Sequence, residues 1–559
     1  MMRPIQRLQV NMQALLALLD RVKAVLSEED HRILRGAVET LGLLTQLLEN
    51  RKTTIHRLRQ MLFGASTEKT RNVLKQNAGE TAIATANGSG ADPGSEPTGE
   101  AGKQGAAPDS TPKGHGRNGA AAYSGAARIK VVHESLKAGD CCPLCEKGKL
   151  YASMAPGLLV RIVGQAPIGA TVYEIEILRC GLCLEVFRAV APEGAGDKKY
   201  DETAGSMMAL LKYGSGTPFY RLERLQGSLG IPLPASTQWD IVHEVARVVE
   251  PAFGELIRQA AQGQLLHNDD TTMKILALMK ASPGDTGSAV GSESERERSG
   301  VFTSGIVSIV NGRRIALFFT GHHHAGENLS EVLKQRASEL GPPIQMCDAL
   351  SRNVPQEFEV ILANCVAHGR RRFVEVVHDF PEECRYVLET LGAVYKNDAI
   401  TREREMPAEE RLAFHQVQSG PLMAGLKQWF EEQFAERKIE PNSGLGQAIS
   451  YMTKHWEPLT LFLRVAGAPL DNSIAEQALK RAVLHRKNAL FFKTSNGAHV
   501  GDVFMSLIHT CELSGANPFD YLTELQRHRE ELIRNPEGWM PWNYTETLRA
   551  ARASPARAA

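Results

Sequence analysis

Apolar residues recur at alternating spacings of four and three positions from Leu8 to Leu26, and a second stretch places Leu34, Leu41, Leu48, Ile55 and Leu62 seven apart. This periodicity predicts two amphipathic helices with the seam of a coiled coil, so we expect residues 1–76 to form a helical region. An intramolecular hairpin and an oligomerising coiled coil are equally consistent with the seam, because periodicity does not identify the partner.

The pattern stops at residue 77. From 77 to 127 Gly, Ala, Ser, Thr and Pro dominate and large apolar side chains nearly vanish, which is typical of a flexible linker. We interpret its basic end, Lys113-Gly-His-Gly-Arg117, as part of a solvated linker. The alternative is a contact with DNA, in which Lys113 and Arg117 would bind phosphates.

Residues 128–200 contain two Cys-x-x-Cys pairs, Cys142 with Cys145 and Cys180 with Cys183, separated by strand-like runs at 158–163 and 170–178. Four thiolates at this spacing bind one Zn²⁺ tetrahedrally and leave no open position for catalysis. We therefore expect a structural zinc ribbon. Cys141 adjoins the first pair, and the Cys-x-x-Cys spacing selects Cys142 over it.

Several short helices are expected between 201 and 260. The amphipathic stretch 219–229 ends at Gly230, a Pro-containing turn follows, and Ser236 and Thr237 offer caps for the next helix. Helix, short turn and capped helix is the arrangement of a helix-turn-helix. Any small helical bundle produces the same pattern.

Strand-like patterns follow in the segment 261–380. An apolar run from 264 ends in Asp269 and Asp270, and strand-like stretches follow at 273–279, 301–310 and 314–320, with a low-complexity loop near 282–300. A helix near 327–340 then precedes the short strand 344–347, which ends at Asp348. Three strands, a helix and a fourth strand are the order of a ribonuclease H-like core, in which Asp269 and Asp348 would meet at adjacent strand ends.

A third acid, Glu476, stands near the start of a predicted helix that begins around Asp471. The intervening 381–468 has helical patterns, so we interpret it as a helical insertion that divides the core into 261–380 and 469–533. The remaining residues, 534–559, are expected to be a C-terminal tail. The fold class is therefore multidomain α+β.

Three converging carboxylates repel one another unless hard divalent cations neutralise them. Mg²⁺ (or Mn²⁺) suits oxygen ligands, and a pair of such ions supports in-line phosphodiester displacement. Each acid taken alone would ordinarily be a solvated surface charge; the prediction depends on their order along the elements.

Basic residues suited to phosphate flank these acids. The candidates are His368, Arg370, Arg371, Arg372, Lys480, Arg481, Arg486 and Lys487. The run His322-His323-His324 has no partners at ligand spacing and is interpreted as a loop or a DNA-contacting surface.

Composition limits the possibilities further. The chain has 559 residues, 43% hydrophobic and 23% charged, with 64 Lys plus Arg against 64 Asp plus Glu. This excludes collagen, a wholly disordered chain and a disulfide miniprotein, and any nucleic-acid contact must be local. The nine cysteines suggest metal ligands and buried thiols. Without a long apolar run or a signal segment, we expect a cytoplasmic protein with no membrane contact.

Motifs along most of the chain resemble those of the IS66 insertion-sequence family of transposases. His267-Asn-Asp-Asp-Thr271 resembles its His-Ala-Asp-Glu-Thr block, and Cys365-Val-Ala-His-Gly-Arg-Arg-Arg-Phe373 resembles Cys-Trp-Ala-His-x-Arg-Arg-x-Phe. The segment Asp471-Asn-Ser-Ile-Ala-Glu476 and the later Arg486-Lys-Asn488 also match. Departures from the family pattern fall at Asp270, Thr272, Ala349 and Val366.

The resemblance implies a DDE transposase with Asp269, Asp348 and Glu476 as catalytic metal ligands. It would cut double-stranded DNA at terminal inverted repeats and join the 3′-hydroxyls to target DNA, as a homodimer or higher oligomer, together with any accessory proteins of the same element. Two alternatives are a non-catalytic zinc-containing DNA-binding protein and a structure-specific nuclease.

Overall fold

The computed structural model describes residues 31, 34–35, 137–141, 147–150, 166–179, 186–192, 196, 198–279 and 300–553. Apart from residues 31 and 34–35, the predicted N-terminal helices lie outside these ranges. So do the linker, both Cys-x-x-Cys pairs and the low-complexity loop up to residue 299.

The described chain contains two compact units. A helical unit comprises His368–Met406 and Phe414–Lys454, and a sheet-containing unit comprises the described residues of Gly88–Ala367, Pro407–Ala413 and His455–Ala559.

A five-stranded mixed sheet forms the centre of the sheet-containing unit, in the order β5-β4-β3-β6-β7. The strands are β3 (Leu265–Thr272), β4 (Phe302–Val310), β5 (Arg313–Gly321), β6 (Ile344–Cys347) and β7 (Ile361–Asn364). Strands β3, β4 and β5 are antiparallel neighbours, whereas β6 and β7 run parallel to β3. The parallel strands need crossover connections, and helix α9 (Ala325–Leu333) lies in the first of them.

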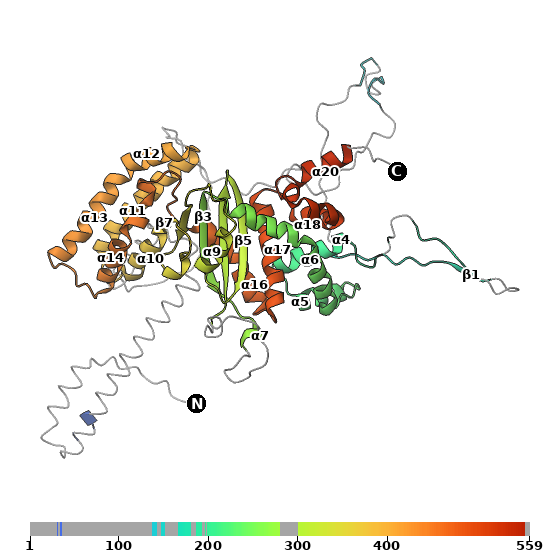
Figure 1. Ribbon diagram of the computed structural model, residues 1–559, viewed down its shortest axis with the longest axis horizontal. Helices are drawn as coiled ribbons and strands as arrows, with labels where there is room; N and C mark the ends of the chain where they lie inside the picture. Colours follow the sequence, from blue (N-terminus) through green and yellow to red (C-terminus); the bar gives the residue numbers. More distant parts are fainter. Residues whose placement is uncertain are drawn as a thin grey trace, which may run out of the picture. The chain divides into compact units, whose positions relative to one another are not determined.

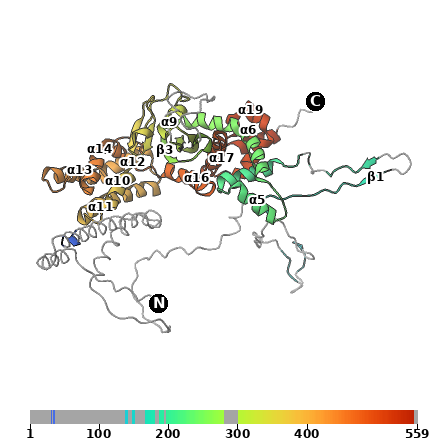
Figure 2. The ribbon, with the colours of Figure 1, turned by 90° about the horizontal axis from the view of Figure 1, so that it is seen from below.

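Helices cover both faces of this sheet (Figure 1). On one face α9 contacts β3 and β4, and Asn328 of α9 donates a hydrogen bond to Ser304 Oγ (2.8 Å). On the other face lies α16 (Ser473–Ala489), because a Cβ at Gly305 would meet the Leu479 side chain at 3.0 Å. Figure 2 shows the sheet between these two helices. Successive residues of β3 therefore point alternately toward α9 and toward α16.

The free edge of β5 is covered by α17 (Ser495–Leu513). Side chains spaced four residues apart on this helix, those of Asp502, Ser506 and Thr510, accept hydrogen bonds from alternate backbone N–H groups of β5. An exposed strand edge invites pairing with another chain, and α17 satisfies this edge with side chains instead.

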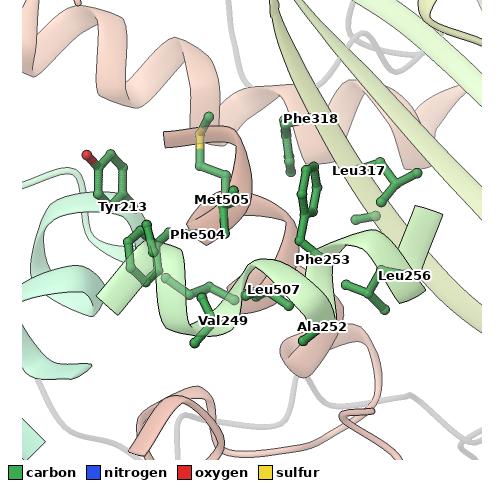
Figure 3. Packing of buried hydrophobic residues seen from close by; sticks show 14 of the residues in the cluster. Tyr213, Val249, Ala252, Phe253, Leu256, Leu317, Phe318, Phe504, Met505 and Leu507 are labelled. Carbon is green, nitrogen blue, oxygen red and sulfur yellow. The ribbon is translucent and has the colours of Figure 1, made fainter. Parts of the chain in front are cut away.

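Helices that precede the sheet extend its core. They are α4 (Glu202–Ala209), the π-helical turn η3 (Leu210–Gly214), α5 (Phe219–Ser228) and α6 (Ala235–Ala260). Phe253 and Leu256 of α6 pack with Phe318 of β5 and Phe504 of α17 in one buried cluster (Figure 3). Ser236 and Thr237 were expected to cap α6, but the helix already begins at Ala235.

The helical unit contains α11 (Pro381–Glu403), α13 (Gly420–Ala435) and α14 (Gly444–Lys454), with parts of α10 (Val366–Val376) and α12 (Ala408–Gln418). Phe373 and Phe430 stack in its interior, with ring centroids 5.9 Å apart. The predicted insertion at 381–468 is helical, but α15 (Trp456–Leu459) and η5 (Leu461–Leu463) pack on β7 in the sheet-containing unit.

The C-terminal residues differ from the predicted tail. Elements α18 (Pro518–Arg527), α19 (Arg529–Arg534), η6 (Pro536–Trp539) and α20 (Tyr544–Ala553) follow α17. Trp539 and Met540 are fully buried, and the Tyr521 hydroxyl donates to Trp539 O (2.9 Å). Residues 534–553 are therefore a packed part of the unit.

Other predictions hold only in part. The strand-like stretch 273–279 is not a strand: it forms the helical turn α7 (Leu276–Met279) after a single bridge between Ile275 and Phe492. Only the end of the run 170–178 forms a strand, β1 (Ile177–Arg179), which pairs with β2 (Val186–Arg188). A short 3₁₀ turn, η4 (Ser351–Asn353), follows Asp348. Among the described ranges, none of the helices combines the length and apolar character needed to cross a bilayer.

Candidate functional site

Strand register places two of the predicted acids at the same end of the sheet. Parallel pairing aligns His267 of β3 with Met346 of β6, so Asp269 and Asp348 each follow an aligned pair by two residues. Neighbouring strands lie about 4.8 Å apart. The register therefore brings both carboxylates to the same end of the parallel strands.

Glu476 joins them from the first turn of α16. The helix contacts β3, and it covers the face toward which Asp269 points, since Asp269 is paired with Gly305. The negative charge of Glu476 contributes to the raised pKa of Asp269. All three predicted acids thus lie in one electrostatic environment.

The pKa of Asp269 is raised to about 7, first by burial and then by the charges of Asp348, Asp270 and Glu476, while one hydrogen bond opposes the increase. That bond runs from the backbone N–H of Asp270 to Asp269 Oδ1 (2.8 Å). A carboxylate among other carboxylates is stabilised by a neighbouring cation. The donor set, all carboxylate oxygen, fits Mg²⁺ or Mn²⁺.

Buried amides on the α9 side fix the loop after Asp348. Asn268 donates to Asn353 O (2.8 Å) and accepts from Gln345 Nε2 (2.8 Å). The Asn353 amide in turn donates to the Asp348 carboxylate. Neutral side chains therefore hold Asp348 without adding charge near the predicted acids.

Asn472 fixes the start of α16 against β3. Its Nδ2 donates to Asn268 O (3.0 Å), so its Oδ1 faces His267 Nδ1 at 3.1 Å. This orientation requires His267 Nδ1 to carry the proton. Burial lowers the pKa of His267 to about 4, which keeps the imidazole neutral at physiological pH. The Asn472 side chain does not cap its own helix; Asp471 Oδ1 accepts from Ser473 N instead (3.0 Å).

Asp270 points toward α9, the face of the sheet opposite to the one toward which Asp269 points. Its carboxylate accepts from His324 Nδ1 (2.8 Å) and lies 3.4 Å from Arg352 Nη2. His324 also precedes α9 directly. The histidine run is thus a connection between β5 and α9, as the loop interpretation predicted, and His324 is held by a carboxylate.

The predicted phosphate-binding residues on α16 have different surroundings. Arg486 donates to Thr271 Oγ1 (3.0 Å) and Thr272 Oγ1 (2.8 Å), just beyond the acids on β3. Lys480 and Lys487 are exposed. Arg481 is engaged with Glu512 and with His509 Nδ1 (3.1 Å).

His368, Arg370, Arg371 and Arg372 lie on α10, within the helical unit. Arg370 is buried, whereas Arg371 and Arg372 are exposed, and the Arg372 guanidinium lies 4.0 Å from the Tyr451 ring centroid. Lys113, Arg117, Cys142, Cys145, Cys180 and Cys183 lie outside the described residues.

Sequence reasoning missed the amide residues that support the acids. Asn268, Gln345, Asn353 and Asn472 are all fully buried. One available signal was the polar run His-Asn-Asp-Asp, which directly follows two leucines in the same strand. Buried polar groups need partners, and such a run predicts a hydrogen-bonded network.

The chain is similar to proteins of one transposase family. A family model described as "Transposase IS66 family" matches residues 199–500, more than half of the chain. This segment contains all three acids and the complete five-stranded sheet.

Three similar proteins come from Sinorhizobium fredii (strain NBRC 101917 / NGR234). "Uncharacterized protein y4hP" is 28% identical over 440 residues, covering 75% of each chain. "Uncharacterized protein y4jD" is 34% identical over 188 residues, 33% of this chain and 36% of the relative. "Uncharacterized protein y4qI" is 22% identical over 346 residues, 60% of this chain and 61% of the relative. The match thus spans less than two thirds of the second and third relatives.

Proposed function

The chain belongs to the IS66 family of transposases, and from this premise we propose that it is a DDE-type DNA transposase. In this proposal it binds the terminal inverted repeats of an insertion sequence, cleaves the strand ends and transfers the 3′-hydroxyls into target DNA. The reaction is a phosphodiester transesterification that depends on Mg²⁺ or Mn²⁺.

The observation that carries the proposal is the register that places Asp269 and Asp348 two residues beyond the same aligned pair of β3 and β6, together with the charge of Glu476 on α16 acting on Asp269. Three antiparallel strands followed by two parallel ones support a ribonuclease H-like core. We assign the catalytic role to these three carboxylates, which would hold the divalent cations. When bound there, such cations supply activation of the attacking hydroxyl and stabilisation of the leaving oxygen.

The chain's own residues prepare this site. Asn353 holds the Asp348 carboxylate, and Asn472 ties the start of α16 to β3. Both contacts come from neutral side chains, so the negative charge that attracts cations is preserved. The raised pKa of Asp269 means that cation binding at neutral pH would displace a proton from a substantial fraction of the molecules.

DNA binding in the proposal depends on cations that contact phosphates without reading sequence. The proposed contacts are Lys480, Arg486 and Lys487 on α16, His368 and Arg370–Arg372 on α10, and Lys113 and Arg117 in the linker. We do not extend this role to Arg481, whose guanidinium is paired with Glu512. The turn between α5 and α6 supports a helix-turn-helix-like contact in addition.

We further propose that Cys142, Cys145, Cys180 and Cys183 bind one structural Zn²⁺. A homodimer or higher oligomer would hold the two DNA ends, with any accessory proteins encoded by the same element.

Purified full-length protein, a labelled duplex carrying the element's end, a target plasmid and Mg²⁺ test the proposal. Joined products are expected from the wild type, and Asp269→Asn, Asp348→Asn and Glu476→Gln should each abolish them while DNA binding persists. Glu530→Gln, at an exposed position of α19, is the matched control. Cleavage without joining would indicate a nuclease, and retarded but intact DNA would indicate a binding protein; either result contradicts the proposal.

A further inference from the structure

Lys212 is a buried cation without a counterion. It lies in the single π-helical turn η3 that continues α4, and the residue is 9% exposed. Among the described residues, no carboxylate acts on the pKa of its ammonium, which is shifted by burial. Single π-turns occur frequently at functional sites.

Aromatic rings are the neighbours that the ammonium does have. Its Nζ lies 5.1 Å from the Phe219 ring centroid and 5.9 Å from that of Tyr213. Cation–π attraction compensates only part of the cost of removing an ammonium from water. Burial lowers the pKa of Lys212 to about 8, so most molecules retain the charge at neutral pH.

His485 of α16 closes the inner side of this site. Its ring stacks on Phe492 (4.5 Å between centroids) and on Tyr213 (6.0 Å), and Tyr213 in turn stacks on Phe504 (Figure 3). Neither ring nitrogen of His485 has a hydrogen-bond partner. Burial and the Lys212 charge lower its pKa to about 3, so His485 is neutral and cannot balance the ammonium.

The outer side is formed by α5 and the end of α16, which Arg221 and Asn488 join. Arg221 of α5 is exposed and its Nη1 lies 3.5 Å from Asn488 Oδ1. The connecting loop turns at Gly216, with φ +74°, where a Cβ would lie only 3.1 Å from the Leu484 side chain and 3.2 Å from the Asn488 amide nitrogen. Arg221 and Asn488 therefore lie together at the end of α16, and Lys212 is close enough to this helix for its charge to act on His485.

The end of α16 is also joined to the strand that carries Asp269. Phe492 N donates to Lys274 O (2.9 Å), and Arg486 binds the threonines at the end of β3. Asn488 lies twelve residues after Glu476 on the same helix, roughly 18 Å at 1.5 Å per residue. Phosphates of one strand recur every ~3.4 Å along a duplex. A strand reacting at the acids would therefore reach this position after roughly five phosphates.

We propose that Lys212, Arg221 and Asn488 form a phosphate-binding site that holds the DNA strand beyond the reacting phosphodiester. An entering phosphate oxygen supplies the counterion that Lys212 lacks, and the Arg221 guanidinium and Asn488 amide donate further hydrogen bonds. The inference rests on the proposed function, because it requires that duplex DNA be the substrate.

Lys212→Met tests the site, because methionine keeps the aliphatic stem and removes the charge. Affinity of the full-length protein for a labelled 40-base-pair duplex of arbitrary sequence is measured by fluorescence anisotropy between roughly 50 and 200 mM salt. We expect affinity at least fivefold weaker and a salt slope smaller by about 1, with a Tm equal to or above that of the wild type. The exposed Arg221→Gln tests the same site without touching the core and should also reduce the slope by about 1.

Lys334→Met is the matched control, since Lys334 is exposed and paired with Glu331 of α9, which is not part of the proposed site. It should leave affinity and slope unchanged. Wild-type affinity and slope in both Lys212→Met and Arg221→Gln would overturn this inference while leaving the proposed function intact. A lower Tm for Lys212→Met, with an unchanged slope in both variants, would show a purely structural lysine and also overturn it. Failure of the wild type to bind any duplex would instead overturn the proposed function, and this inference with it.

Discussion

His267 and Asn472 are 205 residues apart in the sequence, yet their side chains form a buried contact of 3.1 Å between Nδ1 and Oδ1. The contact joins the strand that carries Asp269 to the residue directly before the helix that carries Glu476. The relative position of these two acids therefore depends on a hydrogen bond between neutral side chains.

Asn472→Ala should lower both the stability of the protein and its strand-transfer activity. The change leaves His267 Nδ1 and the Asn268 carbonyl buried without partners, which costs about 1–3 kcal/mol. We expect a lower free energy of unfolding in denaturant titrations and a loss of strand transfer greater than the loss of DNA affinity.

The matched control is Asn517→Ala, since Asn517 caps α18 by accepting from Phe519 N (3.0 Å) and is remote in sequence from the acids. It should lose about 1 kcal/mol of stability and retain strand transfer. Equal losses of strand transfer in the two variants would contradict a positioning role for Asn472.

Asp502 should make stability depend on pH. Burial raises its pKa to about 7 from an ordinary value of 3.8, although Thr320 donates to both of its carboxylate oxygens. Between these two values the folded protein retains a proton that the unfolded chain releases. The free energy of unfolding should therefore fall as pH rises through this window, by up to about 1.4 kcal/mol per pH unit.

Asp502→Asn removes the ionisation and should remove that part of the slope. The test is denaturant unfolding of both proteins at several pH values from 4 to 8, in which the wild type loses stability relative to the variant as pH rises. A wild type that gained relative stability with rising pH would show that the carboxylate is favoured in its ionised form.

Asp269→Asn should stabilise the protein in the absence of divalent cations. The raised pKa of Asp269, caused first by burial and then by the neighbouring acids, means that its ionised form is unfavourable in the folded state. In EDTA at pH 8 we expect a higher Tm for the variant than for the wild type. The difference should shrink toward pH 5, where Asp269 is protonated.

Adding Mg²⁺ should reverse this order in Tm. A cation that binds only the folded wild type stabilises it by about 2.7 kcal/mol when its concentration is 100 times Kd. Thermal unfolding with and without Mg²⁺ measures both effects. A wild type whose Tm is unaffected by Mg²⁺ and Mn²⁺ would argue against a cation site at these acids.

Zinc content tests the four-cysteine prediction separately. One Zn²⁺ per chain is expected in protein purified without chelators, and Cys145→Ser or Cys180→Ser should reduce it markedly, because a three-thiolate site binds more weakly. Cys141→Ser is the control and should retain zinc. Retention of zinc by the first two variants, or its loss in the control, would show that the ligand assignment is wrong.

Elements with strong local signals were predictable from the sequence. The strand Ile344–Cys347 ends directly before Asp348 as expected, and Glu476 lies in the first turn of its helix. The strand-like stretches 301–310 and 314–320 also correspond to β4 and β5. In each case the pattern spans adjacent residues and needs no information about partners.

Elements defined by distant partners were not predictable. Residues 273–279 have the composition of a strand, but Ile275 pairs with Phe492 at a single bridge and the chain then turns into α7. Strand β7 has only four residues and forms beside β6. The pairings of Asn472 with His267 and of Asp270 with His324 join segments with no local pattern in common.

The central claim is that Asp269, Asp348 and Glu476 hold a pair of divalent cations together. Electron paramagnetic resonance of Mn²⁺ bound to the protein–DNA complex tests it most directly. We predict two bound Mn²⁺ per chain with the magnetic coupling of ions about 4 Å apart, and loss of that coupled signal in Asp269→Asn, Asp348→Asn and Glu476→Gln. A coupled signal that persists when any one of the three acids is replaced would contradict the account.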